Sequence, residues 1–348
     1  MSLDEFDLIR RHFRPLASAP AALGLADDAA VVAVEAGHEL VVTTDTLVAG
    51  VHFLADDPPE TLGHKLLAVN LSDLAAMGAE PIAYLLSVAL PRAWAAEAAD
   101  AWLTAFARGL GGLQRQAGIA LIGGDTVGTP TDLVLGLTAL GRVSAGRALR
   151  RSGARPGDLV WVSGTIGDGA LGLAVLSGQL PGLPPSQAAA LVERYRRPSP
   201  RLALGRRLIG VATAVADVSD GLIADLGHIC EASGAAAELH LDRLPLSEAG
   251  RAFSAAAGFG LADLASGGDD YELVFTAPAS AADAVVTAAA AAAVPVSEVG
   301  RIVAVPPADP VGRKNSPVQV VSGGRAVFVG RGGYSHFRGN GAEKTGED

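Results

Sequence analysis

Aspartates beside hydrophobic runs are the residues of this sequence best suited to chemistry. Carboxylates, hydroxyls and water are the ligands that Mg²⁺ prefers, and substrate phosphate often completes its shell. Any one aspartate could be an ordinary turn former or helix cap. A whole set of them instead indicates a polyphosphate site with several metal ions. The set stands where predicted strands end or inside an apolar helix, and comprises Asp28, Asp45, Asp73, Asp125, Asp217 and Asp220.

Asp73 is the most informative of these, because it lies in an otherwise apolar segment predicted to be helical. Leu66, Asn70 and Met77 share its helix face by their spacing. A carboxylate among apolar neighbours costs several kcal/mol unless it is paired or metal-bound. No lysine or arginine lies within seven residues of Asp73. A metal ion is therefore its predicted partner.

Two glycine-rich turns, at 123–125 and 267–270, would let the backbone approach a ligand closely. The phosphate-loop pattern G-x-x-x-x-G-K-[ST] and the protein-kinase motifs are absent from the sequence. Lysine is rare, occurring only at positions 65, 314 and 344. The charge of a triphosphate would therefore be balanced by metal ions and arginine. Arg147, Arg150 and Arg151 form a basic cluster that could bind phosphate or could be a solvated linker.

Composition excludes several other functions. The formal net charge of −10 disfavours a nucleic-acid binder, which needs clustered basic residues. Cys230 is the only cysteine, so an internal disulfide and a cysteine zinc site are excluded. Neither a signal peptide nor a membrane span is predicted. We expect a cytoplasmic protein without a membrane partner.

Hydrophobic patterns predict a mixture of helices and strands throughout, and hence an α/β or α+β fold. Residues 1–20 are predicted to form a short amphipathic helix and its exit, which ends near Pro15 and Pro20. Further helices are predicted at 60–78, 95–117, 166–177, 200–210, 222–232 and 280–293. Strands are predicted at 31–34, 40–43, 84–90, 119–122, 133–143, 159–162, 214–218, 236–241 and 272–276.

The Arg-, Gly- and Pro-rich stretch at 147–157 predicts a domain boundary. We expect one domain over residues 1–146 and a second over 147–338. The polar tail, residues 339–348, is expected to be disordered.

Taken together, these motifs resemble the thiamine-monophosphate kinase family over about residues 3–338. The most specific segments are Thr44–Phe53, Lys65–Gly78, Gly123–Thr126, Gly146–Ala154, Asp217–Leu222 and Gly267–Glu272. The resemblance implies the two-domain fold of the aminoimidazole ribonucleotide synthetase superfamily. Its N-terminal α/β domain binds ATP and forms a homodimer, and its C-terminal domain is also α/β. The implied reaction transfers the γ-phosphoryl group of ATP to thiamine monophosphate.

The resemblance also assigns roles by matching motif positions. Magnesium ions would be held by Asp28, Thr43, Thr44, Asp45, Asp73, Asp125, Asp217 and Asp220. ATP would be bound by Gly124, Asp125, Arg151 and Ser219. Thiamine monophosphate would be bound by His52, Asp269 and Tyr334.

No side chain is expected to act as a general base or a covalent nucleophile. The acceptor is a phosphate monoester with a second pKa of about 6, so it is already mostly dianionic near neutral pH. The barrier is electrostatic, because two polyanions must meet in line.

Two departures from the family pattern affect the site. Ala26 replaces a glycine of the acidic turn that contains Asp28, and Asp269 replaces a glutamate. Because aspartate is one methylene shorter, its contact with substrate would be longer or water-mediated.

Rival functions stay open within the superfamily. Aminoimidazole ribonucleotide synthetase shares the fold. Selenophosphate synthetase expects a reactive cysteine near the N-terminus, and the hydrogenase-maturation relative expects one at the C-terminus; this sequence has neither. A non-catalytic protein that binds nucleotide or metal is the alternative from another class.

Overall fold

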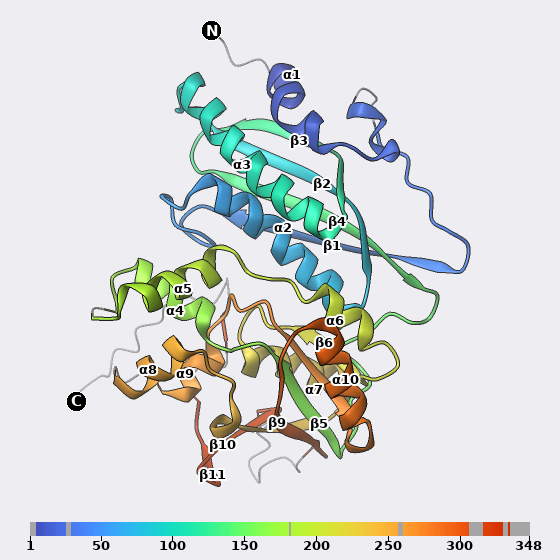
Figure 1. The fold of residues 1–348 in the computed structure, drawn as a ribbon, viewed down its shortest axis with the longest axis vertical. Coiled ribbons are helices and arrows are strands. Elements are labelled where there is room, and N and C mark those ends of the chain that lie inside the picture. Colours follow the sequence, from blue (N-terminus) through green and yellow to red (C-terminus); the bar gives the residue numbers. More distant parts are fainter. Residues whose placement is uncertain are drawn as a thin grey trace, which may run out of the picture.

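The computed structural model describes residues 5–25, 29–180, 182–256, 260–305, 316–329 and 333–334. The chain forms two sheets, each with its own helices (Figure 1). The first half contains α1 (Glu5–Leu8), a π-helix (Ile9–Phe13), 3₁₀ turns (Arg14–Leu16 and Pro20–Leu25), β1 (His38–Val48), α2 (Pro59–Ala76), β2 (Glu80–Pro91), α3 (Ala96–Ala117), β3 (Ala120–Thr129) and β4 (Val134–Ser144).

The second half begins at β5 and has more, shorter elements. Its strands are β5 (Asp158–Ser163), β6 (Ala214–Asp217), β7 (Ala236–His240), β8 (Leu273–Pro278), β9 (Val296–Val303), β10 (Val318–Ser322) and β11 (Arg325–Val327). Its helices are α4 (Asp168–Leu176), α5 (Pro185–Arg196), α6 (Leu202–Arg207), α7 (Leu222–Ser233), α8 (Glu248–Ala256), α9 (Leu261–Ser266) and α10 (Ala282–Ala292), with 3₁₀ turns at Leu241–Arg243 and Ala279–Ala281.

The N-terminal sheet has the strand order β1-β4-β2-β3, and α2 and α3 cover one of its faces (Figure 1). The two helices approach closely at a pair of glycines. A Cβ atom on Gly63 would lie 2.2 Å from the carbonyl oxygen of Phe106, and one on Gly109 would lie 1.9 Å from that of Glu60. Only glycine permits this contact, which fixes α2 against α3 and over the sheet.

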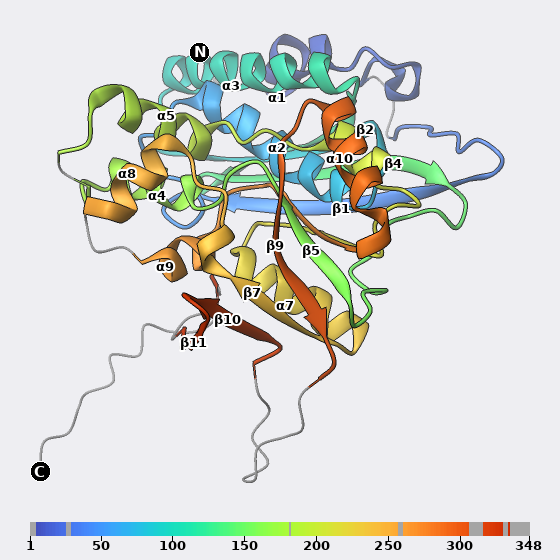
Figure 2. The same ribbon diagram turned by 60° about the horizontal axis from the view of Figure 1, so that its bottom comes forward.

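The second sheet has the order β11-β10-β7-β9-β5-β8-β6. Figure 2 labels β11, β10, β7, β9 and β5 of this sheet. Helix α2 lies between the two halves, because its C-terminal end also packs against the second one. Ala75 and Ala76 share a buried apolar cluster with Leu204, Leu208 and residues of β6 and β8. The residues of α2 can therefore contact groups from both sheets.

The predicted fold class is confirmed, and most predicted elements are present. Residues 31–34 form no strand: Val31 is 69 % exposed, and the segment pairs with no neighbouring strand. The N-terminal helix breaks into short α, π and 3₁₀ segments. Helices α5, α8 and α9 were not predicted. The tail at 339–348 lies outside the described residues.

Two aspartates predicted to follow strands lie within them instead. Asp45 is inside β1 and Asp125 is inside β3. The strand β3 continues past its glycines because it pairs in parallel with β2 as far as Thr129. Within the described part of the chain, no helix is long and apolar enough to cross a membrane.

Candidate active site

A cavity of about 420 Å³ lies where the two halves of the chain meet, and it collects most of the predicted site residues. Strand β1, helix α2, the loop after β6 and the loop before β8 all line it. The predicted residues in its lining are Thr44, Asp45, His52, Asp73, Asp217, Ser219, Asp220, Asp269 and Tyr334.

Strand β1 and helix α2 bring two of the aspartates together. Alternation along β1 turns Thr43 and Asp45 to the same face. The Thr43 hydroxyl donates to Oδ2 of Asp73 on α2, with an oxygen–oxygen distance of 2.5 Å. Thr44 points to the opposite face, where its hydroxyl donates to the Leu137 carbonyl and accepts from Thr138, both at 3.1 Å.

The carboxylates in the cavity are electrostatically unfavourable as a group. Burial, then the charge of Asp73, raises the pKa of Asp45 to about 6. Burial also raises the pKa of Asp73, against the opposing effects of Thr43 and Arg151. The pKa of Asp217 is raised well above its usual range by burial and then by Asp73 and Asp225. A bound cation would relieve this repulsion.

Arg151 lies near this group, since its guanidinium opposes the raised pKa values of Asp73, Asp217 and Asp225. It follows β4 in the chain segment that connects the two sheets, and its side chain is exposed. Arg151 is not among the residues that line the cavity, but its charge acts on the carboxylates that do.

The loop after β6 is held by an aspartate that the sequence analysis missed. Asp225, in the first turn of α7, accepts the backbone N–H groups of Ser219, Asp220 and Gly221 on Oδ2, at 3.1, 3.1 and 3.2 Å. Burial, then Asp220, raises its pKa to about 7. Its place in a helix first turn, after a glycine, was the available signal.

The loop before β8 docks onto the same segment. The N–H of Asp269 donates to the Ser219 carbonyl at 2.9 Å, and the N–H of Tyr271 donates to that of Val218 at 2.8 Å. A Cβ atom on Gly268 would lie 2.4 Å from the Ser219 carbonyl oxygen. Asp269 has a φ of 69°, in the left-handed region. The two loops therefore form one packed unit.

The three residues predicted to bind thiamine monophosphate lie together in the cavity. His52 follows β1, and its Nδ1 accepts the N–H of Val48 at 3.1 Å. The backbone N–H of Tyr334 donates to the Asp220 carbonyl at 3.1 Å, while its side chain is 50 % exposed. Oδ1 of Asp269 accepts the Tyr271 hydroxyl at 3.0 Å.

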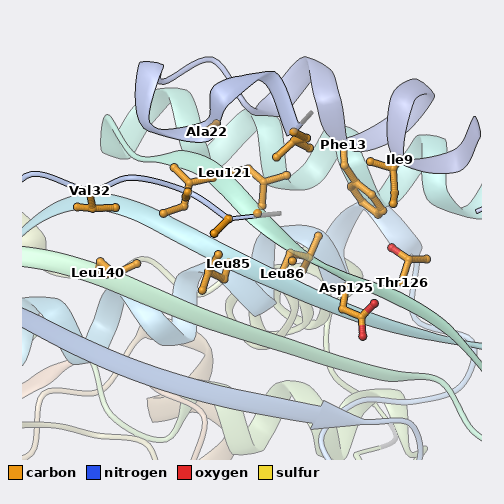
Figure 3. A pocket seen from close by; sticks show the side chains of 16 residues that line it. Ile9, Phe13, Ala22, Val32, Leu85, Leu86, Leu121, Asp125, Thr126 and Leu140 are labelled. Atoms are coloured by element: carbon orange, nitrogen blue, oxygen red, sulfur yellow. The ribbon is translucent and has the colours of Figure 1, made fainter. Parts of the chain in front are cut away.

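Gly124 and Asp125 are not brought into this cavity. They line a separate one of about 630 Å³, between the N-terminal segment and the sheet (Figure 3). Their strand, β3, is three strands away from β1. Three spacings of about 4.8 Å place Asp125 about 14 Å from β1. Asp28 and Ala26 lie outside the described residues.

The donor set fits hard divalent cations, because it consists of carboxylates and hydroxyls. Among the described residues, only Asp220, Asp225 and His228 bring three ligand atoms within 4.8 Å of one another. The carboxylates of Asp45, Asp73 and Asp217 are spread more widely around the cavity. This spacing suits Mg²⁺, which commonly takes one or two carboxylates per ion.

The fold and this cavity define the class of the protein. Residues 26–143 match the family described as AIR synthase related protein, N-terminal domain, and residues 155–309 match the corresponding C-terminal domain. Among solved structures, hydrogenase maturation protein HypE in complex with ATP has a TM-score of 0.73 at 19 % identity, over 94 % of each chain. That likeness concerns the fold alone.

More similar proteins identify the family. The thiamine-monophosphate kinases of Salmonella typhimurium and Caulobacter vibrioides are each 46 % identical to this chain, over 80 % and 86 % of it and 84 % of their own lengths. The crystal structure of thiamine-monophosphate kinase from Stenotrophomonas maltophilia has a TM-score of 0.78 at 43 % identity, over 94 % of this chain and 99 % of that one.

A further structure, described as AaThiL complexed with AMPPCP and TMP, has a TM-score of 0.72 at 29 % identity. The match covers 88 % of this chain and 89 % of the chain in that structure. The chain belongs to the thiamine-monophosphate kinase family, and the predicted resemblance is confirmed.

Proposed function

We propose that this enzyme transfers the γ-phosphoryl group of ATP to thiamine monophosphate, producing thiamine diphosphate and ADP. The observation that carries the proposal is the single cavity in which acidic residues and the His52, Asp269 and Tyr334 group meet. The relatives at 46 % identity carry the name of this activity. The similar structure that contains AMPPCP and TMP supports the same pair of substrates.

The acidic residues would hold several Mg²⁺ ions together with the phosphates of ATP. The proposed ligands are Asp28, Thr43, Thr44, Asp45, Asp73, Asp125, Asp217 and Asp220. Bound Mg²⁺ would neutralise phosphate charge and stabilise the transferring group. The mutual repulsion of Asp45, Asp73 and Asp217 supports this assignment.

The protein itself would position the reactants without supplying a catalytic side chain. The terminal phosphate of the acceptor is already anionic near neutral pH, so no base is needed. Direct in-line transfer then requires only alignment and charge stabilisation. Gly124, Asp125, Arg151 and Ser219 would bind ATP, and the Ser219 loop is preformed by Asp225.

The other part of the cavity would recognise the thiamine moiety. Thiamine carries a cationic ring and an amino group, both of which suit the carboxylate of Asp269. The half-exposed ring of Tyr334 offers a stacking surface. His52 would complete this subsite.

We also propose a homodimer formed through the N-terminal domain, residues 1–146. The sheet face opposite α2 exposes apolar side chains on β1, β2 and β3: Leu40, Val42, Leu85 and Val127 are 40, 56, 38 and 50 % exposed. A second copy with the same exposed face is a self-complementary partner for it. Residues 147–338 would form the second domain.

Asp125 lies on this exposed face, about 14 Å from β1 of its own chain. We propose that Gly124 and Asp125 act in the cavity of the second copy. This arrangement explains why Asp125, although predicted to bind metal, does not line the acidic cavity of its own chain. It also makes the dimer a requirement for activity.

We also propose a cytoplasmic protein without a nucleic-acid or membrane partner. The net charge of −10 supports the part of this proposal that concerns nucleic acid.

The direct test is ADP release from purified protein with ATP, Mg²⁺ and thiamine monophosphate. Free thiamine is the matched control, because it lacks only the acceptor phosphate. Release with the monophosphate alone, abolished by a chelator, is expected. ATP binding without release would contradict the proposal and favour another acceptor or a binding protein.

A further inference from the structure

The buried ammonium group of Lys65 has no role in the function described so far. Lys65 lies on α2 and its side chain is 2 % exposed. Three groups surround its Nζ atom. Oδ1 of Asp269 lies at 3.4 Å, the backbone carbonyl oxygen of His52 at 3.4 Å, and the centroid of the Tyr195 ring at 3.7 Å.

These partners come from distant parts of the chain and converge on the thiamine end of the cavity. His52 and Asp269 both line it. The Tyr195 hydroxyl, from α5, donates to the same His52 carbonyl at 3.4 Å. Lys65 therefore connects the loop after β1 with the loop before β8, which belong to different sheets.

A buried cation at this position needs an explanation. Burial lowers the pKa of Lys65, while Asp269 and then Asp57 raise it. Removing an ammonium group from water costs several kcal/mol before its partners compensate. A methionine would fill a similar volume without this cost. Unlike methionine, the charged Lys65 side chain provides a fixed electrostatic partner for Asp269.

The contacts of the Asp269 carboxylate leave one oxygen for a ligand. Lys65 and the Tyr271 hydroxyl both contact Oδ1. In the described part of the chain, Oδ2 is thus the oxygen that remains to meet a cation or an N–H donor in the cavity. Because Asp269 sits in a left-handed conformation, this anchoring holds a strained residue in one orientation.

Helix α2 also sets the distance between the two ends of the site. Lys65 precedes Asp73 by eight residues. A rise of 1.5 Å per residue places them about 12 Å apart along the helix. The same rigid element therefore fixes the acidic residues and the anchor of Asp269.

We propose that Lys65 is a positioning residue that fixes Asp269 and the His52 loop and so preforms the thiamine subsite without touching the substrate. This proposal rests on the proposed function and deepens it. It predicts that changing Lys65 raises KM for thiamine monophosphate but not KM for ATP.

The experiment compares Lys65→Met with the wild-type enzyme by steady-state kinetics in each substrate. Loss of a charge-assisted contact to Asp269 should raise KM for thiamine monophosphate about 10-fold or more. KM for ATP should stay within about 2-fold, because the contacts of Lys65 are with Asp269, His52 and Tyr195 and with none of the proposed ATP residues. Lys65→Arg, which keeps the charge, should recover most of the affinity.

Two further variants separate this role from a general loss of structure. Arg243→Met removes an exposed ion pair with Glu298 and should change neither constant. In the double variant Lys65→Met/Asp269→Asn, KM for thiamine monophosphate should rise by less than the product of the two single-variant rises, since both changes remove the contact between Lys65 and Asp269.

The possible results are distinct. No turnover by the wild-type enzyme would contradict the proposed function. Wild-type turnover with an unchanged KM for thiamine monophosphate in Lys65→Met would overturn the role of Lys65 alone. Equal rises in both KM values with a lowered melting temperature would also overturn it, in favour of a structural role.

Discussion

Thr43 donates a hydrogen bond to Asp73 across the space between β1 and α2, at 2.5 Å. The bond ties the strand that carries Asp45 to the helix that carries Asp73. Both carboxylates are thereby held on one side of the cavity. Burial raises the pKa of each, and the charge of Asp73 raises that of Asp45 further. This fixed repulsion is the structural basis for the metal site proposed above.

Neutralising Asp45 or Asp73 should separate stability from activity. Asp45→Asn and Asp73→Asn relieve the repulsion, so the metal-free variants should melt at the wild-type temperature or above it. Turnover should fall by orders of magnitude, since the proposed ligands of Mg²⁺ are lost. Thermal melts with and without Mg²⁺, beside the turnover rate, check both parts. A near-wild-type rate in both variants would contradict the assignment.

Mixing two inactive variants tests whether Asp125 acts across a dimer. Asp45→Asn and Asp125→Asn should each be inactive alone. Random exchange of subunits gives half heterodimers, each with one intact site, so about a quarter of wild-type activity should return. The measurement is turnover before and after subunit exchange. If activity does not return although heterodimers form, Asp125 acts within its own chain or not at all.

Glu272 should be among the most costly single residues to neutralise. Its side chain is fully buried and accepts from Arg194 and Arg201 and from the Ser163 hydroxyl, at 2.5 to 2.9 Å. Glu272→Gln leaves two partly buried guanidinium groups without their anion and should cost about 3 kcal/mol. Denaturant unfolding measures this loss.

Glu298→Gln is the matched control for Glu272→Gln. It removes a carboxylate that is 36 % exposed from an ion pair with Arg243. The cost should be no more than about 1 kcal/mol. Equal costs for the two variants would show that the buried cluster contributes no special stability.

Cys230 should be unreactive in the folded protein. Its side chain is fully buried, and burial raises the pKa of its thiol to about 12. Because only the thiolate reacts and the raised pKa keeps the thiol protonated, labelling by iodoacetamide should be negligible from pH 6 to 9. Labelling should become complete in denaturant. Stoichiometric labelling of the native protein would show that α7 opens readily.

Local patterns in the sequence were enough to predict the elements that hold the site. Helices α2 and α3, which were predicted from apolar periodicity, begin and end within a few residues of the predicted bounds. The short buried strands also lie close to their predicted positions. The aspartate in the apolar helix predicted a polar or charged surrounding for Asp73, because the cost of burying a carboxylate must be offset by something nearby. Asp73 indeed lies in the cavity with Asp45 and Asp217.

Contacts between distant residues could not be predicted in this way. Lys65 contacts Asp269, which lies far along the chain, so a search among the sequence neighbours of either residue does not find this pair. The separation of Asp125 from β1 depends on the strand order, which hydrophobic patterns do not determine. Asp125 was predicted from its type and its glycine neighbours, and these signals do not depend on where the strand lies.

The central claim is that the phosphate of thiamine monophosphate accepts the γ-phosphoryl group directly. The most direct measurement uses ATP labelled in its γ-phosphate, with acid quenching and separation of protein, nucleotides and thiamine compounds. The label should appear in thiamine diphosphate, at the rate of ADP formation, with none on the protein and none transferred to free thiamine. Label on the protein, or only in inorganic phosphate, would contradict the account.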